Sequence, residues 1–229
     1  HNDKNTSVLS AINDYFDNIN DVKYKIGFRT FKSEECGVPQ FRRRIILIGT
    51  RIDSKKSDLE LGIIGNLLKT HKSIEGLRKE KEKQKQKQIS LLGSITEPTD
   101  STLKEPVTIW DAISDLPDFE LDDGSEYPFD AKSSYQKQMR KKSNGIYNHQ
   151  LTDHHKSTID TISLVPDGGN YKDLPDRLKN SRRVNIAWTR LNSKKPSFTI
   201  DTGHRHHFHY KYNRVPSVRE SARLQSFPD

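Results

Sequence analysis

The chain is poor in the residues and patterns that mark several protein classes. It has one cysteine, Cys36, which excludes an internal disulfide framework and a zinc site built from several cysteines. A lone thiol fits a reducing compartment. No apolar run approaches the roughly 18 residues that a membrane-spanning helix requires, so we expect no membrane partner. The hydrophobic fraction of 31% is low, yet 229 residues are enough to bury a core of useful size.

Charged residues are abundant and unevenly distributed. Lys and Arg number 39 against 31 Asp and Glu, which gives a net charge of +8 and favours a polyanionic partner such as nucleic acid. Residues 177–223 contain twelve Lys and Arg and two acids, whereas residues 111–130 contain eight acids and neither Lys nor Arg. The positive charge is therefore concentrated towards the C-terminal end, where we expect the surface that faces nucleic acid.

Apolar spacing in the first fifty residues predicts a helix, a strand, a turn and a second strand. Val8, Ile12 and Phe16 recur at helical spacing and predict an amphipathic helix of about 15 residues. An extended stretch follows over residues 22–31. After a turn, the aliphatic run of residues 44–51 is typical of a strand that is buried on both faces. This order predicts the edge of a larger α/β domain.

The pattern after the second strand is weaker and mixed. The segment 75–88 is charged, low in complexity and almost without an apolar face, and it predicts a solvated helix or mobile insertion around residues 71–90. Ser217, with Glu220 three residues later, forms a capping-box pattern at the start of the last helix. Helices are also expected over residues 106–117 and 154–164, and short strands over residues 185–191 and 197–202.

A candidate anion-binding fork lies at the entry to the aliphatic strand. Gln40, Arg42 and Arg44 alternate along an extended segment, and a period of two places their side chains on one face. Two guanidinium groups on one face form a rigid fork for phosphate oxygens or a base carbonyl. An arbitrary Arg-x-Arg pair is more often explained by surface salt bridges. Between a Gly-Val-Pro turn and an aliphatic strand, the pair indicates a functional site.

Two segments are specific enough to indicate a family. They are Gly37-Val-Pro-Gln-Phe-Arg-Arg-Arg-Ile-Ile-Leu-Ile-Gly-Thr-Arg51 and Asn213-Arg-Val-Pro-Ser-Val-Arg-Glu-Ser-Ala-Arg-Leu-Gln-Ser-Phe-Pro-Asp229. They resemble the eighth and ninth of the ten motifs of DNA cytosine-5 methyltransferases. Shorter likenesses occur at Tyr171, in Thr189-Arg-Leu191 and in Lys195-Pro-Ser-Phe-Thr-Ile200. The resemblance therefore covers about residues 22–51 and 147–229, the seventh to ninth motifs and part of the target recognition domain between them.

The resemblance implies roles near the reacting base. Arg42 and Arg44 would lie beside the extruded cytosine and its flanking phosphates, as supporting catalytic and DNA-binding residues. Gln40 would support them locally and contribute to DNA binding. Thr199 would contact a phosphate near the flipped base.

Other residues are assigned by the same resemblance. Further DNA contacts are expected from four residues, Arg190, Arg205, His209 and Arg214. A structural role, which anchors the recognition domain, is expected for three residues of the last helix, Arg219, Glu220 and Arg223. The histidine-rich tract of residues 204–209 invites a metal interpretation, but no carboxylate or cysteine ligand set accompanies it. We therefore predict no metal site and expect this tract to lie near the DNA backbone.

Three motifs of the family's catalytic part are missing from the sequence. There is no Pro-Cys-Gln to supply the thiolate that attacks C6 of cytosine, no Phe-x-Gly-x-Gly loop to bind S-adenosylmethionine, and no Glu-Asn-Val to hold the ring. Cys36 lies between Glu35 and Gly37, next to acids that raise a thiol pKa, and we expect it to be a packing residue. The chain is thus expected to hold no cofactor, with S-adenosylmethionine bound elsewhere in the complete enzyme.

The fold class expected is α+β. Residues 1–52 would form the edge of a Rossmann-like α/β methyltransferase domain, and residues 53–213 a small mixed, largely β target recognition domain. Residues 214–229 would form the helix that returns to the catalytic domain. The implied function is to recognise a specific duplex sequence for methylation of cytosine C5, with base flipping, in a restriction-modification system. Alone, the chain is expected to be inactive.

The expected partners are double-stranded DNA and an N-terminal catalytic part, in the same chain or as a separate subunit. The expected location is the bacterial cytoplasm, in association with the nucleoid. Three biological forms stay open: an excised or truncated piece of a single-chain enzyme, one subunit of a split methyltransferase, and a catalytically dead DNA-binding or regulatory module. Pro-Cys-Gln and Phe-x-Gly-x-Gly in an upstream reading frame would support the enzyme.

Overall fold

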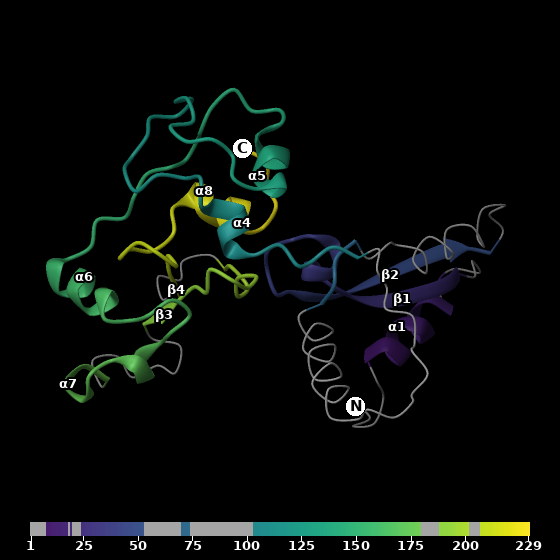
Figure 1. The fold of residues 1–229 in the computed structure, drawn as a ribbon. Coiled ribbons are helices and arrows are strands. Elements are labelled where there is room, and N and C mark those ends of the chain that lie inside the picture. The colour runs from purple at the N-terminus through teal and green to yellow at the C-terminus, as the bar shows by residue number, and fades with distance from the viewer. Residues whose placement is uncertain are drawn as a thin grey trace, which may run out of the picture. The chain divides into compact units, whose positions relative to one another are not determined.

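The computed structural model describes residues 8–17, 19, 24–52, 70–73, 103–179, 188–201 and 207–229 (Figure 1). The chain divides into two compact units. The first comprises residues 1–32 and 43–69, and the second comprises residues 33–42 and 70–229. The functional boundaries predicted from sequence, after residues 52 and 213, stay a prediction. Residues 33–42 belong to the second unit because their backbone pairs with a segment near residue 197.

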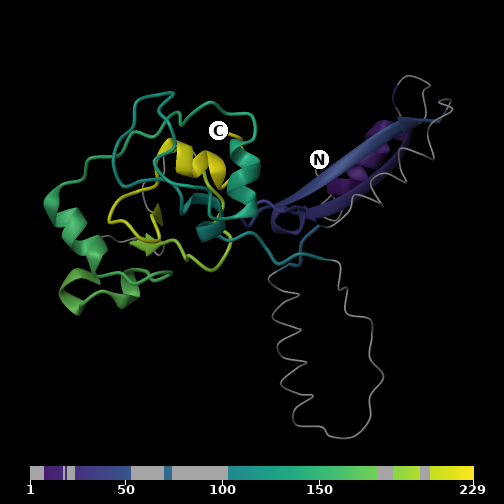
Figure 2. The ribbon, with the colours of Figure 1, turned by 45° about the horizontal axis from the view of Figure 1, so that its top comes forward.

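The first unit is a helix packed on a two-stranded antiparallel ribbon (Figure 2). Helix α1 spans Val8–Asp17, and strands β1 and β2 span Tyr24–Lys32 and Arg43–Arg51. Their register pairs Tyr24 with Arg51 at one end and Lys32 with Arg43 at the other. The Phe16 ring meets the Tyr24 ring edge to face, with centroids 5.6 Å apart. The predicted helix and strands are confirmed, although the helix has 10 residues.

The prediction that the second strand is buried on both faces is wrong. The consecutive side chains Ile45, Ile46 and Leu47 are 53%, 41% and 38% exposed. Within the described residues β2 pairs only with β1, so a two-stranded ribbon leaves much of its apolar surface open. The aliphatic run is the composition of a strand inside a larger sheet, but the described residues do not supply that sheet.

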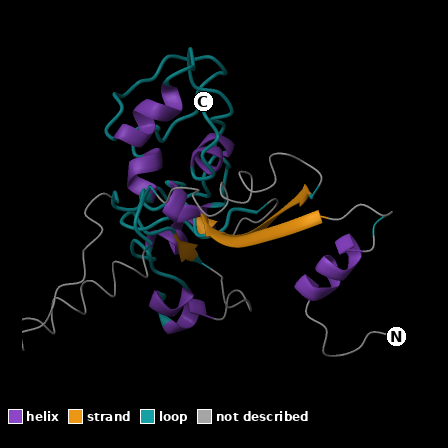
Figure 3. Cartoon of the chain, turned by 90° about the vertical axis from the view of Figure 1, so that its right-hand side faces the viewer, coloured by secondary structure: helices purple, strands orange, loops and turns teal. Residues whose placement is uncertain are grey.

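The second unit consists mainly of short helices and loops (Figure 3). Its helical elements are η1 (Ser33–Cys36), α4 (Ile109–Ile113), α5 (Ser134–Arg140), α6 (Lys156–Ser163), η2 (Tyr171–Asp173), α7 (Asp176–Lys179) and α8 (Val218–Arg223). Strands β3 (Thr189–Arg190) and β4 (His207–Phe208) form a parallel pair of two residues each. The α+β class is confirmed, but a largely β character is wrong for the described residues of this unit.

The main core of the second unit lies where α4, α5 and α8 meet. The predicted apolar face of α4 is confirmed, since Ile109, Ala112, Ile113 and Leu116 are at most 1% exposed. Helix α5 was not expected. Its N-cap Ser133 and the following Gln136 form a capping box, a pattern that the sequence contains as Ser-x-x-Gln. Glutamine is a weaker marker of a helix start than glutamate because it brings no charge to the helix dipole.

The remaining element predictions have mixed outcomes. The capping box of Ser217 and Glu220 is confirmed at α8, and the helix expected over 154–164 is α6. The strand expected from residue 197 is reduced to one isolated bridge between Gln40 and Ser197. The charged segment 75–88 and residues 185–187 lie outside the described residues. No described helix is long and apolar enough to span a membrane.

Candidate DNA-binding site

Two distant motif segments of the second unit are joined by backbone hydrogen bonds. The Phe41 amide donates to the Ser197 carbonyl at 2.8 Å, and the Ser197 amide donates to the Pro39 carbonyl at 2.9 Å. The Thr199 hydroxyl then donates to the Phe41 carbonyl at 2.7 Å. The Gly-Val-Pro-Gln turn and the Ser-Phe-Thr segment therefore form one surface, although more than 150 positions separate them in the sequence.

The turn itself is closed by contacts within the second unit. The Ser33 amide donates to the Arg42 carbonyl at 3.0 Å, and the Val38 amide donates to the Ser33 carbonyl at 3.1 Å. Gly37 has φ +81°, and a Cβ there would lie 2.7 Å from the His71 ring. Only glycine combines that backbone conformation with so close a neighbour. His71 was not predicted as part of the site, because no local pattern links it to Gly37.

The three fork residues differ in exposure. Gln40 is 2% exposed, Arg42 is half-buried and Arg44 is exposed. The Arg44 Nη1 donates to the Arg43 carbonyl at 2.7 Å, an exposed contact. Gln40 is therefore placed as an interior residue of the turn, while the two arginines reach solvent. Arg42 lies in the second unit and Arg44 is the second residue of β2 in the first, so each is described within its own unit.

Arg190, predicted to contact DNA, lies in the interior and is 4% exposed. Its Nη1 donates to the carbonyls of His209 and Tyr212 at 3.1 and 3.2 Å. Its Nη2 donates to the Ile162 carbonyl at 2.6 Å and the Asn213 Oδ1 at 2.7 Å. Burial lowers the pKa of this guanidinium. Its donors hold the loop after β4, so a direct phosphate contact does not fit this geometry.

His209 is also interior, with an exposed fraction of 0%. Its Nδ1 accepts from the amides of Lys211 and Tyr212, both at 3.0 Å, which places the ring proton on Nε2. The Nε2 lies 3.6 Å from the Glu220 Oε1. Burial lowers the pKa of His209 to about 4, so the ring is neutral near pH 7. The predicted contact with DNA does not fit a ring buried in this way.

Arg214 completes this buried group. Its two Nη atoms donate to the two carboxylate oxygens of Glu220, each at 2.8 Å, and its Nε donates to the Asp118 Oδ1 at 2.8 Å. Burial opposes the charge of Glu220, but Arg214 and the Ser217 amide hold its pKa at about 2. Arg214 is 7% exposed and is engaged in a bidentate internal pair, so a direct phosphate contact does not fit this geometry.

Arg223 lies at the centre of the main core. It is 0% exposed and donates from Nη1 to the Asp115 Oδ1 at 2.8 Å and to the Ala112 carbonyl at 3.0 Å. Its Nε donates to the Asp229 Oδ1 at 2.6 Å. Burial opposes its charge, yet the two carboxylates raise the pKa of Arg223 above its usual range. These contacts tie α8 to α4, as the expected structural role requires.

The remaining predicted residues divide between surface and interior. Arg219 is 7% exposed and donates to the carbonyls of Tyr147 and Pro228, each at 2.9 Å. Thr199 is exposed. Arg205 lies outside the described residues. Cys36 is exposed at the end of η1, so the prediction that it is a packing residue is wrong.

The reason for the Cys36 error is the direction of the η1 turn. Its two acids, Glu34 and Glu35, are the residues that the turn buries. The described residues contain no cluster of three or more His, Cys, Asp or Glu side chains that could hold a metal ion.

The profile of the family described as C-5 cytosine-specific DNA methylase matches residues 1–229. The chain belongs to this family. Members use S-adenosylmethionine, but the described glycine turn at Gly168 and Gly169 offers no cradle for it. A Cβ at Gly168 would collide with the Asn192 side-chain amide, and one at Gly169 would lie 2.8 Å from Pro166. This turn therefore does not fit the cofactor.

Several curated relatives are type II methyltransferases. M.DdeI of Desulfomicrobium norvegicum is 28% identical over 91% of this chain and 45% of its own length. M1.HphI of Haemophilus parahaemolyticus is 28% identical over 90% and 40%, and M.AquIB of a Picosynechococcus species is 33% identical over 36% and 56%. The chain thus spans less than half the length of the first two relatives.

A solved structure shares the fold. It is described as a DNA modification methyltransferase encoded within a prophage (E. coli). The TM-score is 0.52 at 20% identity, over 90% of this chain and 51% of that chain. At this identity the likeness concerns the fold alone, and it agrees with a methyltransferase architecture.

Proposed function

We propose that this chain is the DNA-recognition portion of a DNA cytosine-5 methyltransferase from a type II restriction-modification system. The observation that carries the proposal is the joining of the eighth-motif turn to the segment around Ser197 by two backbone hydrogen bonds and the Thr199 hydroxyl. This joint places Arg42 and Thr199 on one unit, next to the basic segment that contains Lys194 and Lys195.

Phosphate contact is the role of the cations that reach solvent. Near the joint in the second unit, Lys194 and Lys195 are exposed and Arg42 is half-buried; in the first unit, Arg44 is exposed. Each such cation releases counterions when it meets a phosphate, so affinity should fall as salt rises. Gln40 supports the turn from inside. Arg190, His209 and Arg214 act behind this surface by holding the loop between β4 and α8.

A catalytic part with the nucleophilic cysteine and the S-adenosylmethionine site is the second partner. It completes the reaction of a DNA (cytosine-5-)-methyltransferase, which this chain alone does not catalyse. Three consecutive apolar side chains of β2, Ile45, Ile46 and Leu47, are exposed. This composition is typical of a strand inside a larger sheet, which supports the proposal of a catalytic part that supplies the sheet. M.DdeI and M1.HphI are each more than twice as long as the region that matches this chain. Each relative therefore has room for such a catalytic part.

A methyl-transfer assay tests this proposal. The chain is incubated with genomic DNA and labelled S-adenosylmethionine, alone and with a separately purified catalytic part encoded upstream. We expect transfer only in the mixture. Robust transfer by the chain alone would contradict the recognition-only role. DNA binding without transfer in the mixture would favour a catalytically dead module instead.

A further inference from the structure

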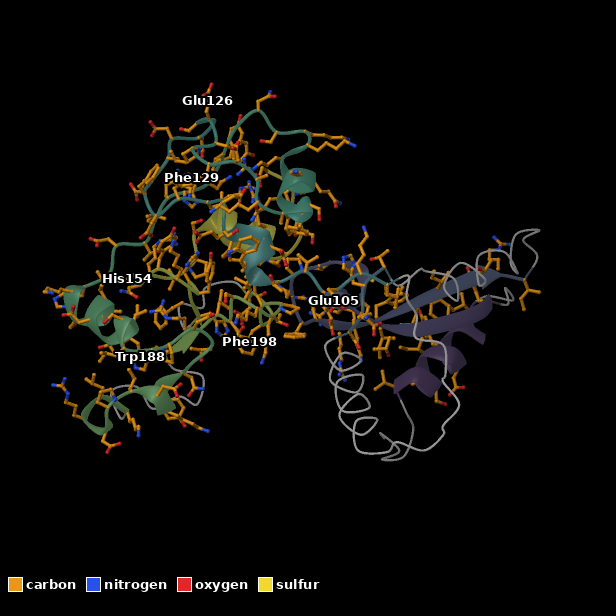
Figure 4. All side chains as sticks on the ribbon, viewed as in Figure 1. Glu105, Glu126, Phe129, His154, Trp188 and Phe198 are labelled. Atoms are coloured by element: carbon orange, nitrogen blue, oxygen red, sulfur yellow. The ribbon has the colours of Figure 1, made fainter. Side chains whose placement is uncertain are left out.

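Phe198 is an exposed aromatic side chain on a rigid backbone (Figure 4). Its exposed fraction is 50%, whereas the preceding Ser197 is fully buried. Hydrogen bonds of Ser197 with Pro39 and Phe41 fix the backbone before it, and the Thr199 hydroxyl fixes the backbone after it. The ring is therefore held in place by its neighbours, without being covered by a core.

Among the described residues, the His207 imidazole orients the Phe198 ring. The Phe198 ring stacks on it with centroids 5.3 Å apart and an interplanar angle of 18°. Because stacking covers only one face of a ring, a half-exposed Phe198 presents its other face or edge to solvent. A ligand that covers the exposed part of this ring removes apolar surface from water, which favours its binding.

The surroundings of Phe198 match one ligand chemistry. Lys194, Lys195 and Thr199 on the same segment are exposed, and Arg42 follows the turn to which the segment is bonded. Proteins that bind nucleic acids with unstacked bases combine cations, which contact the phosphates, with aromatic rings, on which the bases stack. A base stacks on such a ring whatever its identity, since every base has a π face.

We propose that Phe198, backed by His207, stacks on a DNA base whose neighbour has left the helix. This inference rests on the proposed function, because extrusion of the target cytosine is what opens a base face inside a duplex. Phe198 would stabilise the opened duplex without reading its sequence. It is therefore assigned as a base-stacking residue of the recognition surface.

A duplex with a permanently open base face tests the proposal on the chain as it is. Two fluorescent duplexes of one sequence are compared, one intact and one with a single abasic site. We expect the wild-type chain to prefer the abasic duplex. Phe198→Ala should lose about fivefold or more in affinity for it, the lower end of the stacking range, and Phe198→Trp should retain the preference.

Two further variants make the result specific. Phe198→Leu keeps an apolar side chain but lacks a π face, so it should also lose the preference. Phe129→Ala is the matched control, because Phe129 is 46% exposed on the acidic segment and is drawn well away from Phe198 in Figure 4. It should bind both duplexes as the wild type does. Tryptophan fluorescence of Trp110 and Trp188 checks that each variant is folded.

The outcomes separate the two proposals. Salt-dependent binding with equal affinities for folded Phe198→Ala and wild type would overturn the stacking role alone. Full retention of the preference by Phe198→Leu would also overturn it. Absence of salt-dependent binding by the wild-type chain would overturn the proposed function, and the stacking role with it.

Discussion

The arginines of this chain are used in two opposite ways. Arg190, Arg214 and Arg223 are at most 7% exposed, and their Nη atoms donate to internal carbonyls, carboxylates and, for Arg190, the Asn213 amide oxygen. Arg42 and Arg44 lie at the other motif, where one is half-buried and the other exposed. The same side chain is therefore a structural cross-link in one region and a candidate phosphate ligand in the other. Net charge counts both groups equally, although only the second can attract DNA.

The physical difference lies in what surrounds each guanidinium. A buried arginine is tolerated only with a full set of acceptors, and Asp115, Asp229 and Glu220 supply them near the last helix. At the Gly-Val-Pro-Gln turn the nearby acids, Glu34 and Glu35, are buried under the turn. Arg42 and Arg44, which follow this turn, reach solvent.

Among the changes considered, loss of Arg223 should lower the free energy of unfolding most. Arg223→Ala leaves Asp115 and Asp229 buried without their main cation, so we expect about 3–5 kcal/mol less stability. Urea unfolding followed by tryptophan fluorescence measures this, because both tryptophans, Trp110 and Trp188, lie in the second unit. The exposed Lys142→Ala should change stability by about 0.5 kcal/mol or less. Equal effects of the two variants would contradict the cross-link.

Acid should lower the stability of the fold through protonation of His209. Its pKa is lowered from 6.5 to about 4 by burial, so the unfolded chain binds more protons between these values. Stability is then complete above pH 6.5 and falls as pH drops towards 4, by on the order of 2–3 kcal/mol. Unfolding curves measured across this range check the slope. His209→Gln should flatten it, and an unchanged slope would show that other groups titrate.

Loss of Arg42 or of Arg44 should affect function and leave stability intact. In the complete methyltransferase, Arg42→Ala and Arg44→Ala should each cost about 2 kcal/mol or more of activity, the value of a charge-assisted contact. The urea midpoint of each variant should match that of the wild type. Lys142→Ala is again the control. If it lowers activity as much as Arg44→Ala does, the assigned role is wrong.

Of the changes considered, substitution of Thr199 should have the smallest effect. Its single hydroxyl proton is donated to the Phe41 carbonyl, so a phosphate would have to compete for it. We expect Thr199→Val to cost about 1 kcal/mol of stability and to leave the affinity for DNA at fixed salt unchanged. A loss of DNA affinity by the folded variant would instead support the phosphate contact predicted from the family resemblance.

Local patterns predicted local structure well. The apolar spacing of α1 and α4 and the capping box of α8 were sufficient to place these helices, because the residues involved are at most four positions apart. The patterns failed where burial depends on distant segments. The aliphatic run of β2 indicated a covered strand, but covering requires neighbouring strands that a run of residues cannot reveal.

The candidate site was only partly predictable for the same reason. The alternation of Gln40, Arg42 and Arg44 pointed to the turn, and the family motifs added Thr199. Neither indicated that His71 packs on Gly37 or that Phe198 stacks on His207. These contacts join segments that no periodicity connects. The burial of Arg190 and Arg214 was not predicted, because family motifs mark positions and leave exposure unspecified.

The sequence by itself determined the family, the charge and the missing catalytic motifs, because these depend only on which residues are present and in what order. The tertiary structure decided which cations are surface and which are interior. That decision depends on where acceptors such as Asp115 and Glu220 come to lie, more than 100 positions from Arg223 in the first case and six from Arg214 in the second. Burial free energy is a property of these assembled neighbours, so it cannot be assigned to an arginine from its position in a motif.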